Sequence, residues 1–178
     1  MAREQTDLTA RARRVKLLLL DVDGVLTDAT VVVSGEASEA KSFSIRDGFA
    51  LVWARRQGLD VGLLSGRPSP ATARRAAELG ITLVLQPGPL KREPFLALLA
   101  ERGLAPEDVA YMGDDLPDLP VMRRAGLSGA PADAAREVLD KADWVSQYPG
   151  GRGAVREFVE LLLTARGAWA SVVAAYQD

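Results

Sequence analysis

Short apolar runs alternate with segments of helical periodicity along most of this chain, and this alternation limits the possible folds more than any other feature. The runs have the length of β-strands: Val15–Leu20, Val61–Leu64, Thr82–Leu85, Val109–Met112 and a weaker Trp144–Val145. The periodic segments predict helices over Phe49–Arg56, Pro70–Leu79, Glu93–Arg102 and Leu116–Ala125. A glycine suited to a helix C-cap follows each of them: Gly58, Gly80, Gly103 and Gly126.

Strands that read as continuous apolar runs, with helices between them, predict a mainly parallel sheet that helices cover on both faces. We therefore expect one doubly wound, Rossmann-like α/β domain over residues 1–178. A chain of 178 residues is long enough for one sizeable core. In such folds, ligands bind at the carboxyl ends of the strands.

Residues 29–44 interrupt the alternation, because they follow the first strand but show no helical period. Thr30–Val33 is rich in β-branched residues, Ser34–Glu36 resembles a turn, and Lys41–Ser44 alternates. We predict a β-hairpin inserted between the first strand and the first helix of the sheet. Its valine-rich arm needs burial, against its own domain or a neighbouring chain.

Both ends of the chain are expected to contain helix. The polar N-terminal residues favour a short helix over Leu8–Arg14 or a frayed end. The C-terminal tail, about residues 154–178, is apolar and helical to about Ala165, where Gly167 then interrupts it. Four residues at helical spacing follow: Trp169, Val172, Val173 and Tyr176.

Cysteine and histidine are both absent from the sequence. Disulfides, thiolate catalysis and zinc–thiolate sites are therefore excluded, and acid–base chemistry is left to Asp, Glu, Lys or Tyr. A net charge of −2 gives no electrostatic reason to expect nucleic acid or membrane as a partner. Because no segment approaches the roughly 18 apolar residues of a membrane helix, and residues 15–20 are too short for a signal peptide, we expect a cytoplasmic protein.

Asp21 and Asp23 stand directly after the first apolar run and are followed by Gly24. Two carboxylates at this spacing can hold a divalent cation between side-chain and main-chain oxygens, the ligands that Mg²⁺ prefers. The alternative is a plain surface turn, because Asp and Gly are common turn residues.

Two further motifs offer groups that bind phosphate. Ser65, Gly66 and Arg67 follow the second run and supply a hydroxyl and backbone N–H groups that can cradle a phosphate. Lys91 is predicted to open a helix, where the helix dipole disfavours a cation unless an anion lies nearby. Each also has an ordinary explanation, as a loop dipeptide or as a surface lysine.

A cluster of carboxylates follows the run Val109–Met112: Asp114, Asp115 and Asp118. Such groups repel one another unless a cation or solvent relieves them, although a helix-capping turn would explain one or two of them. Since the carboxyl ends of parallel strands meet at one edge of a sheet, all four motifs are expected to converge on one crevice.

With these motifs in order, nearly the whole chain resembles the phosphatase branch of the haloacid dehalogenase superfamily. That family carries an Asp-x-Asp, a Ser or Thr, a Lys and an acidic pair, which here are Asp21/Asp23, Ser65, Lys91 and Asp114/Asp115. Segments 21–28, 44–48, 65–67, 113–118 and 150–157 resemble its 3-deoxy-D-manno-octulosonate 8-phosphate phosphatases. This implies no large cap domain and a homotetramer whose inserted hairpins form a shared β-barrel, so that a neighbouring chain helps to cover each active site.

The resemblance also implies a Mg²⁺-dependent phosphomonoesterase. Asp21 would attack the phosphoryl group and become an aspartyl phosphate, while Asp23 would protonate the leaving oxygen and then deprotonate water. Mg²⁺ would be held by the carboxylates of Asp21 and Asp114 and the backbone carbonyl of Asp23.

Other residues would support these groups. Asp115 and Asp118 would orient the metal ligands or water from behind. Ser65, the Gly66 amide and Lys91 would neutralise the phosphoryl oxygens. One departure from the family is the proline-rich loop 86–90, whose rigidity could alter how Lys91 is delivered.

The implied substrate is 3-deoxy-D-manno-octulosonate 8-phosphate, in lipopolysaccharide precursor synthesis. Arginine could grip the carboxylate of such a sugar acid, and the candidate substrate-binding residues near the crevice are Arg46, Asp47, Gly48, Arg67 and Arg75. Arg75 could instead be a solvated helix residue. Arg152, in the glycine loop 150–153, could reach a site in this chain or a neighbour, or belong to a hinge.

Four other functions share parts of this sequence pattern. A phosphatase for another sugar acid phosphate, with nine carbons, would use the same scaffold. A signalling receiver is also doubly wound and phosphorylated on Asp, but the second acid, Asp23, argues against it. A catalytically idle scaffold is disfavoured because every motif residue is present, and a phosphomutase because no segment is long enough for a large cap.

Overall fold

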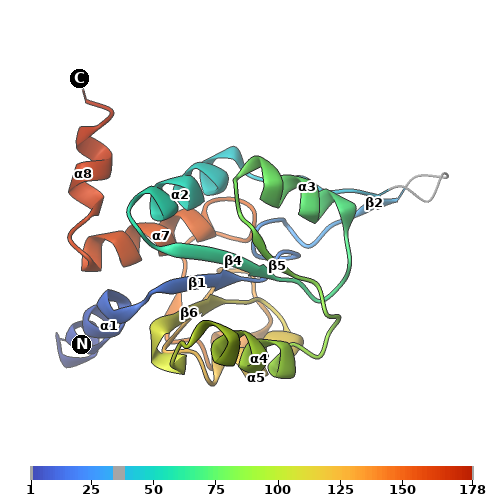
Figure 1. Ribbon diagram of the computed structural model, residues 1–178, viewed down its shortest axis with the longest axis horizontal. Helices are drawn as coiled ribbons and strands as arrows, with labels where there is room; N and C mark the ends of the chain where they lie inside the picture. Colours follow the sequence, from blue (N-terminus) through green and yellow to red (C-terminus); the bar gives the residue numbers. More distant parts are fainter. Residues whose placement is uncertain (1, 34–38, 178) are drawn as a thin grey trace.

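The computed structural model describes residues 2–33 and 39–177, and its centre is a six-stranded parallel sheet with the order β5-β4-β1-β6-β7-β8 (Figure 1). The strands are β1 (Leu17–Leu20), β4 (Asp60–Leu64), β5 (Leu83–Leu85), β6 (Val109–Met112), β7 (Leu127–Ala130) and β8 (Trp144–Val145). The predicted doubly wound α/β fold is confirmed.

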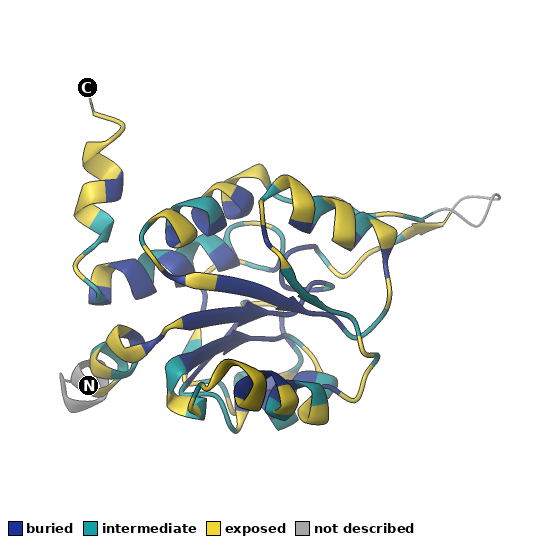
Figure 2. Cartoon of the chain, viewed as in Figure 1, coloured by how far each residue is buried: buried dark blue, intermediate teal, exposed yellow. Residues whose placement is uncertain are grey.

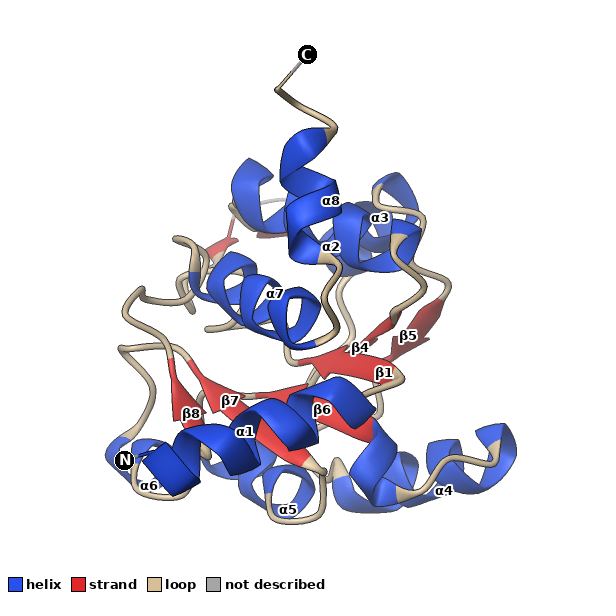
Figure 3. Cartoon of the chain, turned by 90° about the vertical axis from the view of Figure 1, so that its left-hand side faces the viewer, coloured by secondary structure: helices blue, strands red, loops and turns tan. Residues whose placement is uncertain are grey.

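Helices cover both faces of this sheet (Figure 3). One face carries α2 (Ile45–Arg56), α3 (Pro70–Glu78) and α7 (Ala154–Ala165). The other face carries α4 (Arg92–Arg102), α5 (Leu119–Met122) and α6 (Arg136–Leu139). The remaining helices are α1 (Ala2–Arg14), which leads into β1, α8 (Trp169–Ala174), and the 3₁₀ turns η1 (Pro106–Asp108) and η2 (Leu116–Asp118).

The leucine run of β1 shows why both faces must be covered. Leu18 and Leu20 belong to the hydrophobic core beneath α2 and α7, whereas Leu17 and Leu19 belong to the core beneath α4 and α5. All four side chains are at most 1% exposed, and Figure 2 shows the central strands as buried throughout. Since successive side chains of a strand point to opposite faces, an uninterrupted apolar strand requires a core on each side.

The strand order reverses at β1. From β1 the chain runs outward through β4 and β5, and it then returns to the other side of β1 with β6, pairing Leu17 with Val109. The carboxyl ends of β1 and β6 therefore flank the point where ligands bind in open α/β sheets. Asp21 and Gly113 are the first residues after these two ends.

The inserted hairpin is confirmed, but its second arm differs from the prediction. Val32–Val33 (β2) pairs antiparallel with Glu39–Ala40 (β3), whereas residues 41–44 form no strand. The predicted turn at Ser34–Glu36 lies outside the described residues. Val32 and Val33 are 68% and 77% exposed, so the described part of this chain does not bury the valine-rich arm.

Strand β7 was not predicted, because Leu127-Ser128-Gly129-Ala130 contains no β-branched residue. It is nevertheless fully buried between β6 and β8. The small residue Gly129 admits the ring of Phe158 from α7, which would lie 3.0 Å from a Cβ at that position. Packing against α7 therefore explains a strand that local propensity does not indicate.

The helix predicted over Leu116–Ala125 was too long. The structure has a 3₁₀ turn followed by the four-residue α5, and Pro117 and Pro120 interrupt regular helical hydrogen bonding there. Gly126 accordingly does not cap a helix with a left-handed conformation, unlike Gly58, Gly80 and Gly103. It is required for space, since a Cβ there would lie 2.5 Å from the carbonyl oxygen of Glu107.

The C-terminal tail is helical on both sides of Gly167, as predicted, and aromatic contacts hold it against α2. Trp53 packs edge-on against Trp169 and Tyr176, with ring centroids 5.8 and 5.9 Å away. Its Nε1–H also donates to the Tyr176 hydroxyl at 3.0 Å. Within the described ranges, no helix is both long and apolar enough to cross a membrane.

Candidate active site

Asp21 and Lys91 come from different strand ends and meet in the crevice. Asp21 follows β1 and is 7% exposed, and Lys91 stands at the start of α4 and is 2% exposed. The Lys91 ammonium lies 2.7 Å from Oδ1 of Asp21 and 2.6 Å from Oδ1 of Asp118. These two carboxylates explain why a cation is tolerated at this helix N-terminus. Lys91 reaches them directly after the proline-rich loop 86–90.

Asp118 fixes the arrangement of this group. One carboxylate oxygen accepts from Lys91 and from the hydroxyl of Tyr111 at 2.6 Å. The other accepts from the backbone N–H groups of Asp114 at 3.0 Å and Asp115 at 3.2 Å. Both oxygens of Asp118 are therefore engaged, which makes this residue a support for the loop after β6.

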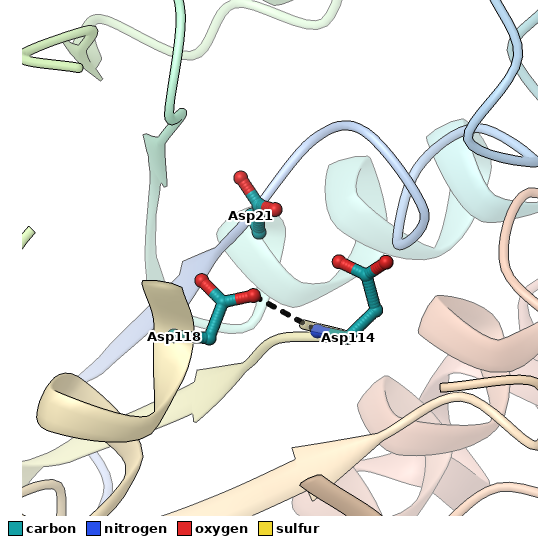
Figure 4. A group of neighbouring side chains, drawn as sticks. All are labelled: Asp21, Asp114 and Asp118. Atoms are coloured by element: carbon teal, nitrogen blue, oxygen red, sulfur yellow. Dashed lines mark hydrogen bonds between the residues drawn. The ribbon is translucent and has the colours of Figure 1, made fainter. Parts of the chain in front are cut away.

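Asp114 has a buried oxygen without a partner. Asp21, Asp114 and Asp118 each place an oxygen within 4.8 Å of the other two, and Figure 4 shows the three side chains gathered at the ends of β1 and β6. Among the residues that the structure describes, Oδ1 of Asp114 has no hydrogen-bond partner. Oδ1 of Asp21 has none either, although it lies within ion-pair distance of Lys91.

Crowding shifts the pKa values of these carboxyls upward. Burial, then the charges of Asp21 and Asp118, raise the pKa of Asp114 to about 8. Burial and Asp118 raise the pKa of Asp21 to about 6, against the lowering influence of Lys91. The pKa of Lys91 is raised, because the attraction of Asp21 and Asp118 outweighs the opposing effect of burial.

These observations fit a divalent cation. Carboxylates that are costly to ionise together, one of them with an unpartnered buried oxygen, are what a hard cation would relieve. Because both oxygens of Asp118 are engaged, Asp21 and Asp114 are the members of this cluster best placed to hold Mg²⁺. The role of the Asp23 backbone carbonyl as a third ligand stays a prediction.

Asp23 lies beside Asp21 but is held by different partners. Lys41 Nζ is 2.7 Å from its Oδ1, and Arg67 Nε is 3.1 Å from its Oδ2. Arg67 also binds Glu39 of β3 at 2.7 Å. The hairpin base therefore contacts the residue predicted to transfer protons.

Ser65 and Gly66 form the loop after β4. Ser65 is fully buried, and its hydroxyl donates to the Arg67 carbonyl oxygen at 3.2 Å. Gly66 lies against Lys91, since a Cβ there would be 3.5 Å from the Lys91 Cε. The predicted phosphate loop thus stands beside the Asp21–Lys91 pair.

A cavity of about 260 Å³ joins these motifs. Its lining comes from all four predicted motifs and the base of the hairpin: Asp21, Asp23, Ala29, Val31, Gly66, Arg67, Pro89, Lys91, Asp115, Pro117 and Asp118. A larger cavity, about 430 Å³, lies beside Arg46, Arg152 and Arg156 and is lined by none of the clustered aspartates. The smaller cavity is therefore the candidate active site.

The glycine loop 150–153 braces the loop of Asp21 and Asp23. A Cβ on Gly150 would lie 1.8 Å from the carbonyl oxygen of Gly24, and the Gly151 N–H donates to the Val25 carbonyl at 2.9 Å. This close backbone packing argues against a freely moving hinge at the start of α7. Arg152 is solvent-facing at 70% side-chain exposure and is 3.8 Å from Asp28.

Asp47, predicted to bind substrate, is fully buried and turns toward α7. Its carboxylate accepts from the backbone N–H groups of Gly153 at 3.1 Å and Arg156 at 2.8 Å. Burial nevertheless raises its pKa, against these bonds. Both oxygens are thus engaged at the N-terminus of α7, which contradicts the expectation that this side chain faces the crevice mouth.

Four other predicted substrate contacts are also absent from the lining of the 260 Å³ cavity: Arg46, Gly48, Ser65 and Arg75. Arg75 binds the Ser44 carbonyl at 3.4 Å and Glu78 at 3.3 Å, so it is not simply solvated. Gly48 leaves room for it, since a Cβ there would lie 2.3 Å from the guanidinium. Arg46 lines the larger cavity.

Sequence reasoning missed Lys41 and Tyr111. Lys41 was assigned to the alternating arm of the hairpin, and nothing in its local pattern distinguished it from a solvated strand residue. Tyr111 carried a usable signal, because a phenol inside a buried strand needs a hydrogen-bond partner. Burial and the charge of Asp118 raise the pKa of Tyr111, so its hydroxyl stays a donor to Asp118.

Comparison with known proteins agrees with this arrangement. The family model for haloacid dehalogenase-like hydrolases matches residues 35–126. A 3-deoxy-D-manno-octulosonate 8-phosphate phosphatase from Escherichia coli is 44% identical over 161 residues, which cover 90% of this chain and 86% of that protein.

Two solved structures extend the comparison. A probable YrbI family phosphatase from Pseudomonas syringae is 42% identical and superposes with a TM-score of 0.94 over 97% of this chain and 98% of that one. The 3-deoxy-D-manno-octulosonate 8-phosphate phosphatase from Moraxella catarrhalis, in complex with magnesium, phosphate and a KDO molecule, is 33% identical. Its TM-score is also 0.94, over 97% of this chain and 99% of that chain.

Proposed function

Because this chain belongs to the haloacid dehalogenase-like hydrolases, and among them to the 3-deoxy-D-manno-octulosonate 8-phosphate phosphatase family, we propose that it hydrolyses 3-deoxy-D-manno-octulosonate 8-phosphate to the free sugar acid and phosphate. The observation that carries this proposal is the meeting of Asp21, Lys91 and the unpartnered Asp114 oxygen at the carboxyl ends of the strands. This grouping supports a nucleophile, a cation and a metal ligand acting together, as phosphoryl transfer requires.

Asp21, Asp114 and the backbone carbonyl of Asp23 would hold Mg²⁺, which would supply positive charge at the phosphoryl oxygens. The Asp21 carboxylate attacks phosphorus, forming an aspartyl phosphate as the bond to the sugar oxygen breaks. Asp23 gives its proton to that leaving oxygen. Asp23 then takes a proton from the water that attacks phosphorus, which releases phosphate and restores the Asp21 carboxylate.

Lys91 and the loop of Ser65 and Gly66 stabilise the negative charge of the phosphoryl oxygens during both steps. Lys91 is held by Asp118 at 2.6 Å, so its ammonium is positioned before substrate arrives. The Gly66 N–H, beside Lys91, would bind a phosphoryl oxygen, and the Ser65 hydroxyl would do so after releasing the Arg67 carbonyl. No step needs histidine, in agreement with its absence from the sequence.

The substrate assignment is tested by phosphate release with Mg²⁺ across three classes of compound. We expect the highest kcat/KM with 3-deoxy-D-manno-octulosonate 8-phosphate. A higher value with a nine-carbon sugar acid 9-phosphate would move the assignment to that substrate. A preference for hexose phosphates would contradict a sugar-acid phosphatase of either kind.

The proposed enzyme is a homotetramer in the cytoplasm, where it serves lipopolysaccharide precursor synthesis. Support for assembly through the hairpin comes from Val32 and Val33, which are 68% and 77% exposed, and from Val31, which lines the catalytic cavity. A neighbouring hairpin would bury the two valines and extend the cavity wall, and could bring Arg46 or Arg152 toward a substrate carboxylate. A double variant carrying Val32→Lys and Val33→Lys should sediment as a smaller species than the wild-type tetramer. A wild-type monomer would contradict the assembly.

A further inference from the structure

Lys41 is buried to an unusual degree for a residue beside a two-stranded hairpin. Its side chain is 0% exposed. The ammonium lies 2.7 Å from Oδ1 and 3.0 Å from Oδ2 of Asp23, and 3.3 Å from the hydroxyl of Thr72 in α3. Since a buried cation is tolerated only when it is paired, Lys41 and Asp23 depend on each other for their placement.

Arg67 is the second cation on Asp23, but it is held differently. Its side chain is 41% exposed, and its Nη2 has no hydrogen-bond partner. It divides its contacts between Oδ2 of Asp23 at 3.1 Å and Glu39 at 2.7 Å, while Glu39 also accepts from the Ser69 hydroxyl. Arg67 lines the catalytic cavity and is thus free to turn toward a bound anion, whereas Lys41 is enclosed.

We propose that Lys41 is a positioning residue that orients the Asp23 carboxylate for proton transfer, an assignment that rests on the phosphatase function proposed above. Both cations hydrogen-bond to Oδ2 of Asp23, Lys41 at 3.0 Å and Arg67 at 3.1 Å. Oδ1 lies 2.7 Å from the Lys41 ammonium but makes no hydrogen bond among the described residues, so it is the oxygen available to the leaving group.

The position of Lys41 in the chain gives this role a second consequence. Lys41 directly follows β3, and Glu39 of the same strand holds Arg67. Both cations on Asp23 are therefore tied to the base of the inserted hairpin. Any movement of that hairpin against α3 changes the orientation of Asp23, so the hairpin aligns a catalytic group besides lining the cavity.

The test compares Lys41→Met with Lys41→Arg and with the exposed control Lys141→Met. For 3-deoxy-D-manno-octulosonate 8-phosphate, whose alkoxide leaving group needs a proton, Lys41→Met should lower kcat by about 10²-fold or more, within the range of general acid–base catalysis. KM should change much less. Lys41→Arg should restore a large part of kcat, and Lys141→Met should match the wild type.

A second substrate separates positioning from a merely structural role. Nitrophenolate leaves without a proton, so Lys41→Met should still phosphorylate Asp21 with p-nitrophenyl phosphate but hydrolyse the phosphoenzyme slowly. We expect a burst of nitrophenolate of about one equivalent per site, detected by stopped flow. An equal loss of kcat with both substrates and no burst would overturn the positioning role.

A double-mutant cycle with Asp23→Asn completes the test. If Lys41 acts through Asp23, adding Lys41→Met to Asp23→Asn should leave kcat unchanged. The double variant leaves neither a buried Lys41 cation nor an Asp23 carboxylate without its partner, which keeps the comparison valid where Lys41→Met alone folds poorly. Additive losses would refute the proposal. A wild-type enzyme that releases no phosphate from any sugar acid phosphate would instead refute the phosphatase function.

Discussion

The carboxylate of Asp114 occupies the space in which a side chain on Gly24 would lie. A Cβ on Gly24 would be 1.9 Å from Oδ2 of Asp114, which no real contact permits. Gly24 also has a φ of +88°, a conformation that L-residues with side chains rarely adopt. The glycine after Asp23 thus allows the two strand ends to bring their carboxylates together.

We predict that Gly24→Ala displaces Asp114 and lowers Mg²⁺-dependent kcat/KM by about 10²-fold, the effect expected of a misplacement of about 1 Å. Gly58→Ala is the matched control, because Gly58 also has a positive φ, +75°, but open space around its Cβ. The control should lose stability and keep its activity. Equal kcat/KM in the two variants would show that activity does not depend on Asp114 occupying the space beside Gly24.

Asp21→Asn is expected to leave no measurable turnover, because an amide cannot replace the attacking carboxylate. The fold should persist, since a neutral side chain at this buried position removes the repulsion from Asp118. Phosphate release and circular dichroism measure the two effects, with the exposed Asp140→Asn as a control. Turnover near the wild-type rate would exclude Asp21 as the nucleophile.

Metal-free protein should become less stable as the pH rises from about 4 to about 8. Both Asp21 and Asp114 bind a proton more tightly in the folded state, with pKa values of about 6 and about 8 against 3.8. Their stabilising contribution is complete below the unfolded pKa and is lost as the pH passes the folded values. As the pH rises over this range, the melting temperature of the wild type should therefore fall relative to that of Asp114→Asn. A constant difference would contradict the raised pKa of Asp114.

Added Mg²⁺ should reverse this trend. Since the ion must displace a proton from Asp114, its apparent affinity should increase by up to about tenfold per pH unit below pH 8. Calorimetric titration at several pH values measures this dependence, and EDTA should abolish activity. Affinity that is independent of pH between about 6 and 8 would indicate that Asp114 is already ionised without the metal.

Lys91→Met should destabilise the metal-free protein by about 3–5 kcal/mol, the usual result of removing one partner from a buried ion pair. Asp21 and Asp118 would then face each other without the cation between them. The exposed Lys141→Met should change the free energy of unfolding by less than about 0.5 kcal/mol. Urea titration compares the variants, and a similarly small loss for Lys91→Met would mean that the carboxylates do not depend on it.

Much of the fold could be predicted from local sequence because nearly every residue of β1, β4 and β6 is apolar. Such strands need cover on both faces, which selects a doubly wound sheet. Leu127–Ala130 was not predicted as a strand, and the helix after Asp118 was predicted too long, since small residues and prolines carry weak or misleading local signals. Their structure depends on Phe158 and on the neighbouring strands.

Motif order and the geometry of parallel strands are enough to predict that Asp21, Asp23, Lys91 and Asp114 come together at the strand ends. The partners of these residues depend on tertiary packing. It turned Asp47 toward α7, engaged both oxygens of Asp118, and brought Lys41 from the hairpin onto Asp23. Hydrophobic periodicity indicates the type of secondary structure and the face that it buries. An ion pair between residues far apart in the chain depends instead on tertiary packing, which no local pattern contains.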